Sequence, residues 1–471
     1  MVKISDFIVS IKNLFNTPLF PLKKLVKLTV LFFSTFLICN FIIRALFTHI
    51  VSAKYLPNLW PMSIACFRVS ILGINSVKFP EFSLTLADMG IVLLYVIFFF
   101  LLLRYLHILK NPYFLYFTGL GSVLLSNLIH GVYNGLVFPI VGMYGIEYYY
   151  DAIKISDSLA FIRNYNAIQP TLLCHSKVHP PGAVLTYKFL NDIFASPQAI
   201  SIALMCISLL IIFYIYKLIK EEFNKDLALF VSLFFIFIPA IQIYYLSSLD
   251  GVIAFTFLGA LYHYLRWRKE KSWFDYTLCI VFLFLSAFLT YMAIFLILLI
   301  VLHSLKDKDI KRIVILFTPL VFIFLGFYFL LNFNYIAGFI TASQIENPYG
   351  PFILVQPITY LVTRLENIAE IILFFGPVAT LLLYRGLKNK TNEMTQLCKL
   401  AMLVLLIMFL TGAYKTGETA RACLYIYPLL LLPIAYYLSK KNDFSIHEKR
   451  QILFVLWVQS ILMQIFLFFS W

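Results

Sequence analysis

The chain is dominated by apolar stretches that approach or exceed the roughly 20 residues an α-helix needs to cross a bilayer. They recur along its whole length. Because a lipid-embedded segment has no water to satisfy its backbone groups, each stretch is predicted to be a helix. Hydrophobic residues make up 62% of the chain and charged residues 13%, whereas a soluble domain carries about a quarter charged residues. The sequence therefore predicts an all-α, polytopic transmembrane helical bundle.

We expect about thirteen helices in one domain covering residues 1–471. The predicted spans are 27–47, 88–107, 113–138, 198–217, 227–246, 251–267, 275–289, 291–305, 313–332, 367–385, 397–413, 421–438 and 451–470. Basic clusters flank the run 276–305 on both sides, so both flanks are expected in the cytoplasm. A single crossing would place one cluster outside. We therefore divide the run at "LTYMA", Leu289 to Ala293, into two short helices.

Most of the 37 Lys and Arg residues fall in connections that are cytoplasmic if the N-terminus is cytoplasmic. This bias predicts a multi-pass membrane protein oriented in that way. It also explains much of the net charge of +15. Nucleic-acid binding would need one basic face rather than scattered short loops, so no nucleic-acid partner is expected. Residues 1–24 are predicted to form an interfacial amphipathic helix, because apolar residues recur there at helical spacing.

Three connections expected outside the cytoplasm are long, namely 48–87, 139–197 and 333–366. Long loops between short ones commonly carry function. The segment 139–197 is the richest in ionisable side chains, and we expect it to hold the catalytic site. The segment 333–366 is predicted to be a lid or a substrate-recognition loop.

An acidic and a basic group of residues share the segment 139–197. The acids are Glu147 and Asp151, and the basic side chains are Arg163, His175, Lys177 and His179. A carboxylate near the membrane can act as a general base towards a hydroxyl, while basic side chains can neutralise a leaving phosphate. These two needs fit the transfer of a sugar from a lipid phosphate. Asp151 is predicted to be the base, with Glu147 as the second candidate.

The motif "HPPG" ends the basic group. Pro180 restricts His179 to an extended conformation, and Gly182 permits a close approach of the backbone where the loop enters a helix. We expect this motif to hold the imidazole in a fixed pose. The plainer alternative is that the prolines simply begin a helix and that the histidine is solvated.

Two smaller polar groups lie at helix ends on the same predicted side. One is Asp250, which either binds substrate or only caps the next helix with a neighbouring serine. The other comprises Lys415, Glu418 and Arg421, in which the glutamate can reach either base within a helical turn. This group either binds phosphate or is satisfied internally as a helix cap. For Glu147 and Asp151, the alternative is a solvated loop within an aromatic belt.

Two stretches together resemble a known family: "AFIRNYNAIQPTLLCHSKVHPPGAVL" and "GETARACLYIYPLLLLP". They are similar to the GT-C superfamily of polytopic glycosyltransferases that use lipid-phosphate sugars, particularly to bacterial relatives of protein O-mannosyltransferases and aminoarabinose transferases. The resemblance implies an all-helical fold, a catalytic acid in an early external loop and a histidine-proline-proline segment before the next helix. It places His179 on that segment, Asp151 on the acid, and Glu418 and Arg421 on a "GE-x-x-R" element.

One feature departs from the family pattern, in which the acid follows the first span. The first external loop here offers only Glu81 and Asp88. With that departure, the sequence predicts transfer of a sugar from a polyprenyl-phosphate donor to a hydroxyl of a lipid, glycan or protein. A glycan polymerase or ligase, and a flippase or transporter of lipid-linked sugars, stay open as alternatives. No cofactor is required, although nearby acids leave a divalent cation open.

Overall fold

The computed structural model describes residues 86–106, 110–142, 147–347, 352–355, 357–388, 392–414, 419–441 and 444–466, together with Lys27, Val30, Leu31 and Ser34. Every regular element in these ranges is helical, as the sequence predicted. The interfacial helix expected in 1–24 lies outside the described residues, and so do nearly all of the span 27–47 and of the loop 48–87.

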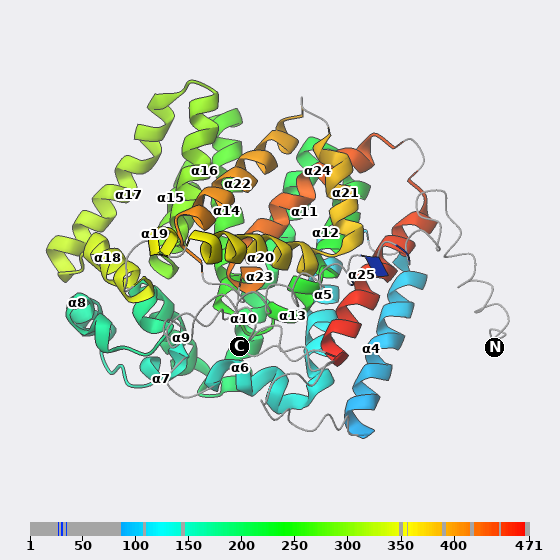
Figure 1. Cartoon of the computed structure of the whole chain (residues 1–471), viewed down its shortest axis with the longest axis horizontal. Helices are drawn as coiled ribbons and strands as arrows, with labels where there is room; N and C mark the ends of the chain where they lie inside the picture. Colours follow the sequence, from blue (N-terminus) through cyan, green and yellow to red (C-terminus); the bar gives the residue numbers. More distant parts are fainter. Residues whose placement is uncertain are drawn as a thin grey trace.

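The helices follow one another along the chain with short connections (Figure 1). The first half contains α4 (Leu86–Arg104), α5 (Pro112–Asn127), α6 (Phe138–Val141), α7 (Tyr148–Ala152), α8 (Ser158–Ile168), α9 (Pro181–Phe194), α10 (Pro197–Leu209), α11 (Ile211–Glu222), α12 (Lys225–Ile236), α13 (Pro239–Tyr244) and α14 (Leu249–Glu270). The second half contains α15 (Trp273–Leu289), α16 (Ala293–Lys306), α17 (Ile310–Leu331), α18 (Tyr335–Glu346), α19 (Phe352–Val355), α20 (Pro357–Phe375), α21 (Pro377–Leu387), α22 (Glu393–Leu410), α23 (Thr419–Ala422), α24 (Tyr427–Ser439) and α25 (Ile446–Phe466). Short 3-10 or π segments, labelled η, complete the set.

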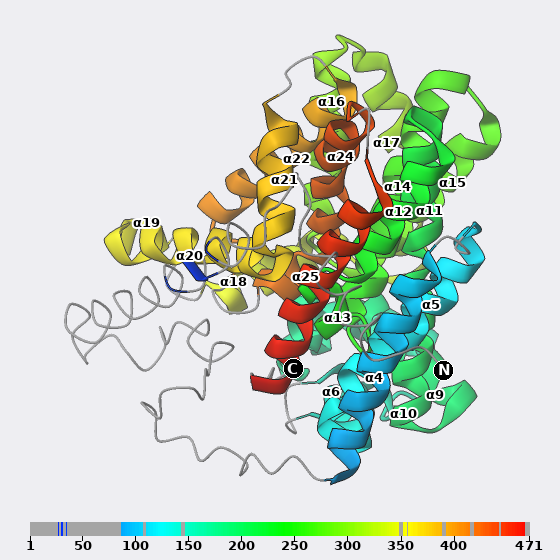
Figure 2. The same ribbon diagram turned by 90° about the vertical axis from the view of Figure 1, so that its right-hand side faces the viewer.

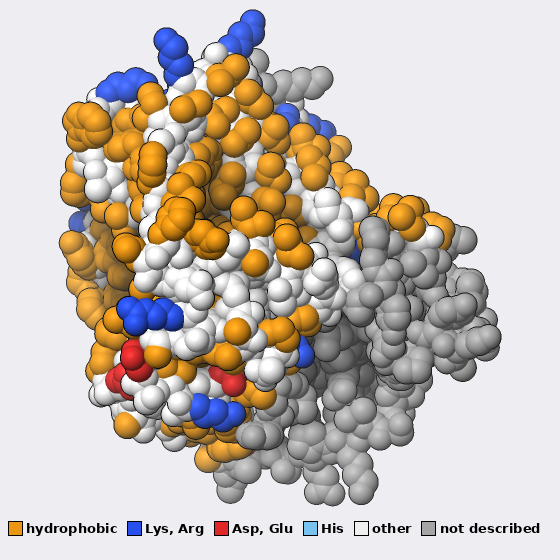
Figure 3. Space-filling model, turned by 90° about the vertical axis from the view of Figure 1, so that its left-hand side faces the viewer, with side chains coloured by type: hydrophobic (Ala, Val, Ile, Leu, Met, Phe, Trp, Pro, Cys, Tyr) orange, Lys and Arg blue, Asp and Glu red, His pale blue; other side chains and the backbone are white. Residues whose placement is uncertain are grey.

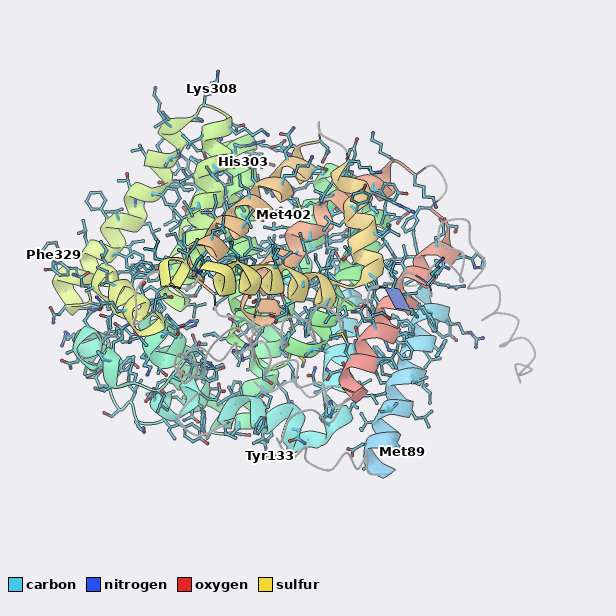
Figure 4. All side chains as sticks on the ribbon, viewed as in Figure 1. Met89, Tyr133, His303, Lys308, Phe329 and Met402 are labelled. Carbon is cyan, nitrogen blue, oxygen red and sulfur yellow. The ribbon has the colours of Figure 1, made fainter. Side chains whose placement is uncertain are left out.

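Five stretches of the described chain are long and apolar enough to cross a membrane. They are Ala87–Arg104, Pro112–His130, Pro197–Glu222, Ile310–Leu331 and Glu393–Leu410. α17 has the most exposed apolar surface of these, and Phe329 points outward from it (Figure 4). Figure 3 shows hydrophobic side chains over the upper part of this face, Lys and Arg at its upper edge, and charged side chains again below. An apolar band between two charged ends is what a membrane-spanning bundle presents.

The predicted division at Leu289–Ala293 is confirmed. α15 ends at Leu289, Thr290 adopts an extended conformation, and α16 begins at Ala293. The side chain of Thr290 accepts a hydrogen bond from the backbone N–H of Met292 at 3.1 Å, which stabilises the turn. Both helices are shorter than the other candidate spans, as expected when one apolar run is divided in two.

Several predicted spans are interrupted, which corrects their boundaries. The span 227–246 is divided before Pro239, because proline cannot continue the backbone hydrogen bonds of a helix. The span 113–138 ends as α5 at Asn127 and continues through η4 (Leu128–His130) and η5 (Tyr133–Val137), with Gly131 between them at φ +81°. The span 367–385 is a pair of helices, Asn367–Phe375 and Pro377–Leu387. The chain bends by 103° between them, at Gly376. α20 consequently lies across the bundle (Figure 1).

The segments 139–197 and 333–366 were predicted to be long loops, and within the described residues this is wrong. The first contains α7, α8 and α9, and the second contains α18, α19 and the start of α20. Side-chain caps explain where two of these helices begin: Asp157 accepts from the N–H groups of Leu159 and Ala160, and Asn334 accepts from that of Ala337. These short helices lie at one end of the bundle (Figure 1).

The opposite end is closed by ion pairs between helix tips. Arg268 of α14 pairs with Asp307 at 3.1 Å and also with Glu393 of α22. Arg312 of α17 pairs with the same Asp307 at 2.9 Å and with Asp309 at 2.8 Å. His303, which lies close to Arg268, marks this end in Figure 4. Figure 2 shows α4 beside α5, with α25 at the front of the view, and Figure 1 shows these three helices on the side of the molecule away from α18.

Helices α21 and α24 are packed so closely that Gly386 leaves no space for a side chain. A Cβ at this position would overlap the carbonyl oxygen of Pro433 in α24. We predict that Gly386→Ala lowers the free energy of unfolding by about 1–3 kcal/mol, because the backbones must separate. The measurement is the unfolding temperature of the purified protein in one detergent.

The matched control for this prediction is Gly326→Ala in α17, where a Cβ meets no atom within 4 Å. This variant should be neutral or more stable, by up to about 1 kcal/mol, because alanine favours the helix. Equal unfolding temperatures for the two variants would contradict the close packing of α21 on α24.

Candidate functional site

A cavity of about 420 Å³ lies where the short helices meet the ends of the long ones. Its volume is within the range of about 300–1,000 Å³ that is usual for small-molecule sites. Its polar wall includes Glu147, His175, His179, Asp250 and Arg421. Its apolar wall includes Ile294 and Leu298 of α16, Phe339 of α18, and Ile407 and Met408 of α22. The cavity therefore offers charged groups and a hydrocarbon surface to one ligand.

Glu147 is buried in this wall, with 5% of its surface exposed. Its Oε2 lies 3.6 Å from Nδ1 of His175. Its Oε1 is buried and has no hydrogen-bond partner among the described residues. Gly142, at φ +38°, allows the chain to pass against the glutamate side chain, where a Cβ would come within 2.7 Å of its Cγ. Burying a carboxylate oxygen without a hydrogen-bond partner costs folding free energy. A ligand that donates a hydrogen bond to Oε1 would remove this cost.

The first turn of α14 supplies the second carboxylate. Ser248 caps the helix: its Oγ accepts from the backbone N–H of Asp250 at 3.0 Å and donates to the Asp250 carboxylate at 2.9 Å. The same carboxylate lies 3.6 Å from Nε of Arg421. The helix cap predicted for Asp250 with a neighbouring serine is present, and Asp250 also lines the cavity, while its predicted role in binding substrate stays a prediction.

Arg421 is carried into the cavity by the short helix α23. The buried carboxylate of Glu370 in α20 accepts a hydrogen bond from the backbone N–H of Ala420 at 3.0 Å, one residue before the arginine. Arg364, also in α20, donates to the carbonyl groups of Phe409 and Tyr414. The transverse helix α20 therefore connects the end of α22 with the start of α23.

His179 has the extended backbone that the proline motif predicted, with φ −119° and ψ 157°, and α9 begins at Pro181. Its Nδ1 lies 3.2 Å from the carbonyl oxygen of Leu289 at the end of α15. Gly182 packs against the same end, where a Cβ would overlap the carbonyl of Phe288. The predicted fixed pose and close approach are confirmed. Burial lowers the pKa of His179 below its usual 6.5, and the nearby Asp250 only partly opposes this.

Side chains of α7 and α8 hold the backbone of the histidine segment in place. Asp151 accepts a hydrogen bond from the backbone N–H of Leu173 at 2.8 Å. Tyr165 donates to the carbonyl groups of Ser176, at 3.2 Å, and of His179. One turn later, Nε2 of Gln169 donates to the carbonyl of Lys177 at 2.9 Å and to that of Gly338 in α18, also at 2.9 Å. The segment is therefore anchored on both sides of His175.

The structure separates the predicted site residues into three sets. One set lines the cavity: Glu147, His175, His179, Asp250 and Arg421. A second set is described but lies outside the lining: Asp151, Lys177 and Arg163. The remaining two, Lys415 and Glu418, lie outside the described residues. The buried Asp151 holds a backbone N–H rather than facing the cavity, so its predicted role as the base has no geometric support, and Glu147 takes its place in the proposal below.

Sequence analysis missed the aromatic part of the lining and one acid. The aromatic residues are Tyr148, Tyr187, Tyr291, Tyr414 and Tyr425. Tyr148 stacks on Tyr187 with ring centroids 5.4 Å apart. Glu346, at the end of α18, is a further carboxylate of the lining. Its segment was predicted to recognise substrate, but nothing local distinguished this acid. Tyr291 lies in the break between α15 and α16, which the sequence predicted, so the position of this break could have indicated a site at this end of the bundle.

The divalent cation left open by the sequence stays a prediction. Within the described ranges, His, Cys, Asp and Glu side chains form no group of three or more that could hold a metal ion. Two of the carboxylates in the lining already have a charged or titratable neighbour: Glu147 lies near His175, and Asp250 lies near Arg421.

No model of a known protein family matches this chain, and no curated protein matches its sequence.

The anchor formed by Tyr165 can be tested by removing one atom. In Tyr165→Phe, the carbonyl groups of Ser176, which is buried, and of His179, which is half-buried, lose their donor, and we predict a decrease of about 1–3 kcal/mol in the free energy of unfolding. The control is Tyr113→Phe, whose hydroxyl is at an exposed position and has no partner among the described residues. Unfolding temperatures in detergent provide the comparison, and equal effects would contradict the anchor.

The lowered pKa of His179 predicts a dependence of stability on pH. The unfolded chain takes up the histidine proton first, near pH 6.5, whereas burial keeps the folded histidine neutral to lower pH. The stabilisation is therefore fully present above about pH 6.5 and is lost as the pH falls. From about pH 7 to pH 5, wild-type stability should fall more steeply than that of His179→Asn, which has no imidazole to protonate. Parallel pH curves would exclude a buried neutral imidazole.

Proposed function

We propose that this chain is an integral-membrane glycosyltransferase that moves a sugar from a polyprenyl-phosphate donor to a hydroxyl of a lipid, glycan or protein outside the cytoplasm. The observation that carries the proposal is the buried Glu147 carboxylate, which has one oxygen near His175 and one without a described partner, in a cavity with an apolar wall. This combination suits a reaction in which a base meets a substrate that is partly hydrocarbon.

Glu147 is assigned as the general base. Its unpartnered Oε1 can accept the proton of the attacking hydroxyl, while His175 holds Oε2 and fixes the orientation of the carboxylate. The hydroxyl oxygen forms a bond to the anomeric carbon of the sugar. The bond between that carbon and the phosphate oxygen breaks, and its electron pair stays on the polyprenyl phosphate. Glu147 then passes its proton to water. Whether the anomeric configuration is inverted or retained stays open.

Arg421 is assigned to the donor phosphate. It is the only Lys or Arg among the described residues that line the cavity. Arg421 adds positive charge beside the first turn of α14, whose N-terminus carries the positive end of the helix dipole. Asp250 orients the guanidinium through their 3.6 Å contact. Positive charge placed where a phosphate group leaves stabilises the transition state more than the ground state.

The apolar wall supports a lipid donor. Ile294, Phe339 and Ile407 line the cavity, and each keeps between 37% and 40% of its surface exposed. They belong to α16, α18 and α22 and give the cavity a hydrocarbon wall. In the proposed complex, the polyprenyl tail lies along this wall while its phosphate reaches Arg421.

The proposed setting is a bacterial cell membrane with the N-terminus in the cytoplasm and about thirteen spans. Lys306, Lys308 and Lys311 lie at the tips of α16 and α17, and the cavity residue Ile294 lies at the other end of α16. If the basic tips face the cytoplasm, the cavity faces the outer side, where such donors present their sugar. A fold like that of the GT-C enzymes is part of this proposal.

The proposal predicts that Glu147→Gln lowers sugar transfer by a factor of roughly 100 to 10,000, because the base is lost while the shape is kept. Asp151→Asn should retain transfer within about tenfold, since an amide oxygen can still accept from Leu173. The assay follows labelled polyprenyl-phosphate sugars in membranes that contain the full chain. Unfolding temperatures confirm that both variants are folded.

The same assay separates the rival functions. Transfer that survives in Glu147→Gln would overturn the assigned base. Movement of the labelled lipid across the membrane without any transfer would replace the enzyme by a flippase or transporter. Growth of a labelled saccharide by repeated units, or block transfer of a long glycan, would favour a polymerase or ligase that shares the same donor class.

A further inference from the structure

The carbonyl of Leu289 determines where the proton of His179 sits. A carbonyl oxygen only accepts hydrogen bonds, so the 3.2 Å contact requires the proton on Nδ1 of the imidazole. In the neutral ring, Nε2 then carries a lone pair and no proton. This assignment follows from the partner atom rather than from an observed hydrogen.

The helix break makes this carbonyl available. The last carbonyl groups of a helix have no N–H partner within the helix. α15 ends at Leu289, and Thr290 is extended, so the Leu289 carbonyl faces the start of α9 instead of a further helical turn. Tyr165 fixes the backbone of His179, and Gly182 brings α9 against the carbonyl of Phe288. The imidazole is thus held by its neighbours at both its backbone and its ring.

The unprotonated Nε2 has no hydrogen-bond donor among the described residues. Its charged and titratable surroundings are Asp250 of α14, Glu346 of α18 and His175. The two carboxylates accept hydrogen bonds and donate none when ionised. Nδ1 of His175 lies beside Glu147. The ring of Tyr148 approaches that of His179 edge to face, with centroids 5.4 Å apart. A molecule bound in the cavity, which His179 lines, can supply this donor.

We propose that Nε2 of His179 accepts a hydrogen bond from a hydroxyl group of the bound substrate and that this histidine does not bind the donor phosphate. The inference rests on the proposed function only in taking the substrate to be a hydroxyl-bearing sugar or its acceptor. It reverses the role expected from the sequence, in which His179 was a basic group for phosphate. The phosphodiester anion that joins the sugar to the lipid has no hydroxyl group and offers only oxygen lone pairs, which a bare Nε2 would repel.

Glu147 and His179 both line the cavity, and each carries an acceptor atom without a described donor. For Glu147 this atom is the buried Oε1, and for His179 it is Nε2, because Nδ1 contacts Leu289. Arg421 lies beside Asp250. The wall at Glu147 and His179 favours a ligand group that donates hydrogen bonds, whereas the wall at Arg421 favours a group that accepts them. A sugar with free hydroxyls joined to a phosphate meets both demands in one molecule.

The first test is nitrogen-15 NMR of histidine in the full chain reconstituted in lipid nanodiscs. The signal of His179 is assigned by its loss in His179→Asn from the set of 8 histidines. At neutral pH we expect a proton on Nδ1 and none on Nε2. A polyprenyl-phosphate hexose should move the Nε2 signal in the direction of an accepted hydrogen bond, and polyprenyl phosphate without a sugar should leave it in place. A protonated Nε2, or the same shift with the sugar-free lipid, would overturn the inference.

The second test separates the acceptor role from a structural one. In His179→Asn the amide can still donate to Leu289, but nothing replaces Nε2, and we expect the KM for the hydroxyl-bearing acceptor or donor to rise roughly five- to tenfold. His179→Gln carries an acceptor oxygen near the position of Nε2 and should recover part of the loss. Equal losses in both variants, with unchanged unfolding temperatures, would count against the role of Nε2.

The two proposals can fail separately. If no lipid-linked sugar is transferred but the sugar still shifts the Nε2 signal, the transferase is excluded and the hydroxyl contact stands. If Glu147→Gln loses transfer but no added sugar shifts the Nε2 signal, the transferase assignment stands and the hydrogen bond from a substrate hydroxyl to His179 is excluded.

Discussion

Backbone carbonyl groups at the ends of broken helices are the constraint on which the site depends. In a bilayer, a helix end must find partners inside the protein, since lipid supplies none. α15 ends at Leu289, and its terminal carbonyl contacts His179. The preceding carbonyl, of Phe288, is approached by Gly182. α22 ends at Leu410, and the carbonyl groups of its end are bound by Tyr360 and Arg364 of α20. The ends of α15 and α22 are thus completed by His179, just before α9, and by two side chains of the transverse helix α20.

The ion pairs at the two ends of the bundle differ in how closely their atoms approach. At the tips of α14, α16, α17 and α22, acids and arginines pair with one another, and Asp307 alone contacts both Arg268 and Arg312. Bonds from these arginines lower the pKa of Asp307, although burial alone would raise it. At the cavity, the pairs are looser: Glu147 with His175 and Asp250 with Arg421 are both at 3.6 Å. Tight pairs leave little for a ligand, whereas loose pairs around a cavity can exchange one partner for a substrate.

The parts of this arrangement that sequence predicted are those set by local rules. The break at "LTYMA" followed from basic residues on both flanks, and the pose of His179 followed from two prolines and a glycine. The Gly-Pro pair at Gly376 and Pro377 is also a local signal for a break. We nevertheless predicted one continuous span, because the whole run 367–385 is apolar. The segments predicted as loops contain helices, and caps such as Asp157, which a hydropathy window does not detect, mark where two of them begin.

The choice between Glu147 and Asp151 could not be made from sequence, because both lie in "EYYYD", four residues apart. The structure distinguishes them by their partners, not by their exposure, since both are buried. Asp151 has the Leu173 N–H as a donor, whereas Oε1 of Glu147 has none among the described residues. An acid whose lone pairs are satisfied by the backbone stabilises the fold, and an acid left short of a donor in a cavity needs a ligand. The same criterion, applied to a ring nitrogen, gives His179 its role: in both side chains the atom without a partner points to what the cavity binds.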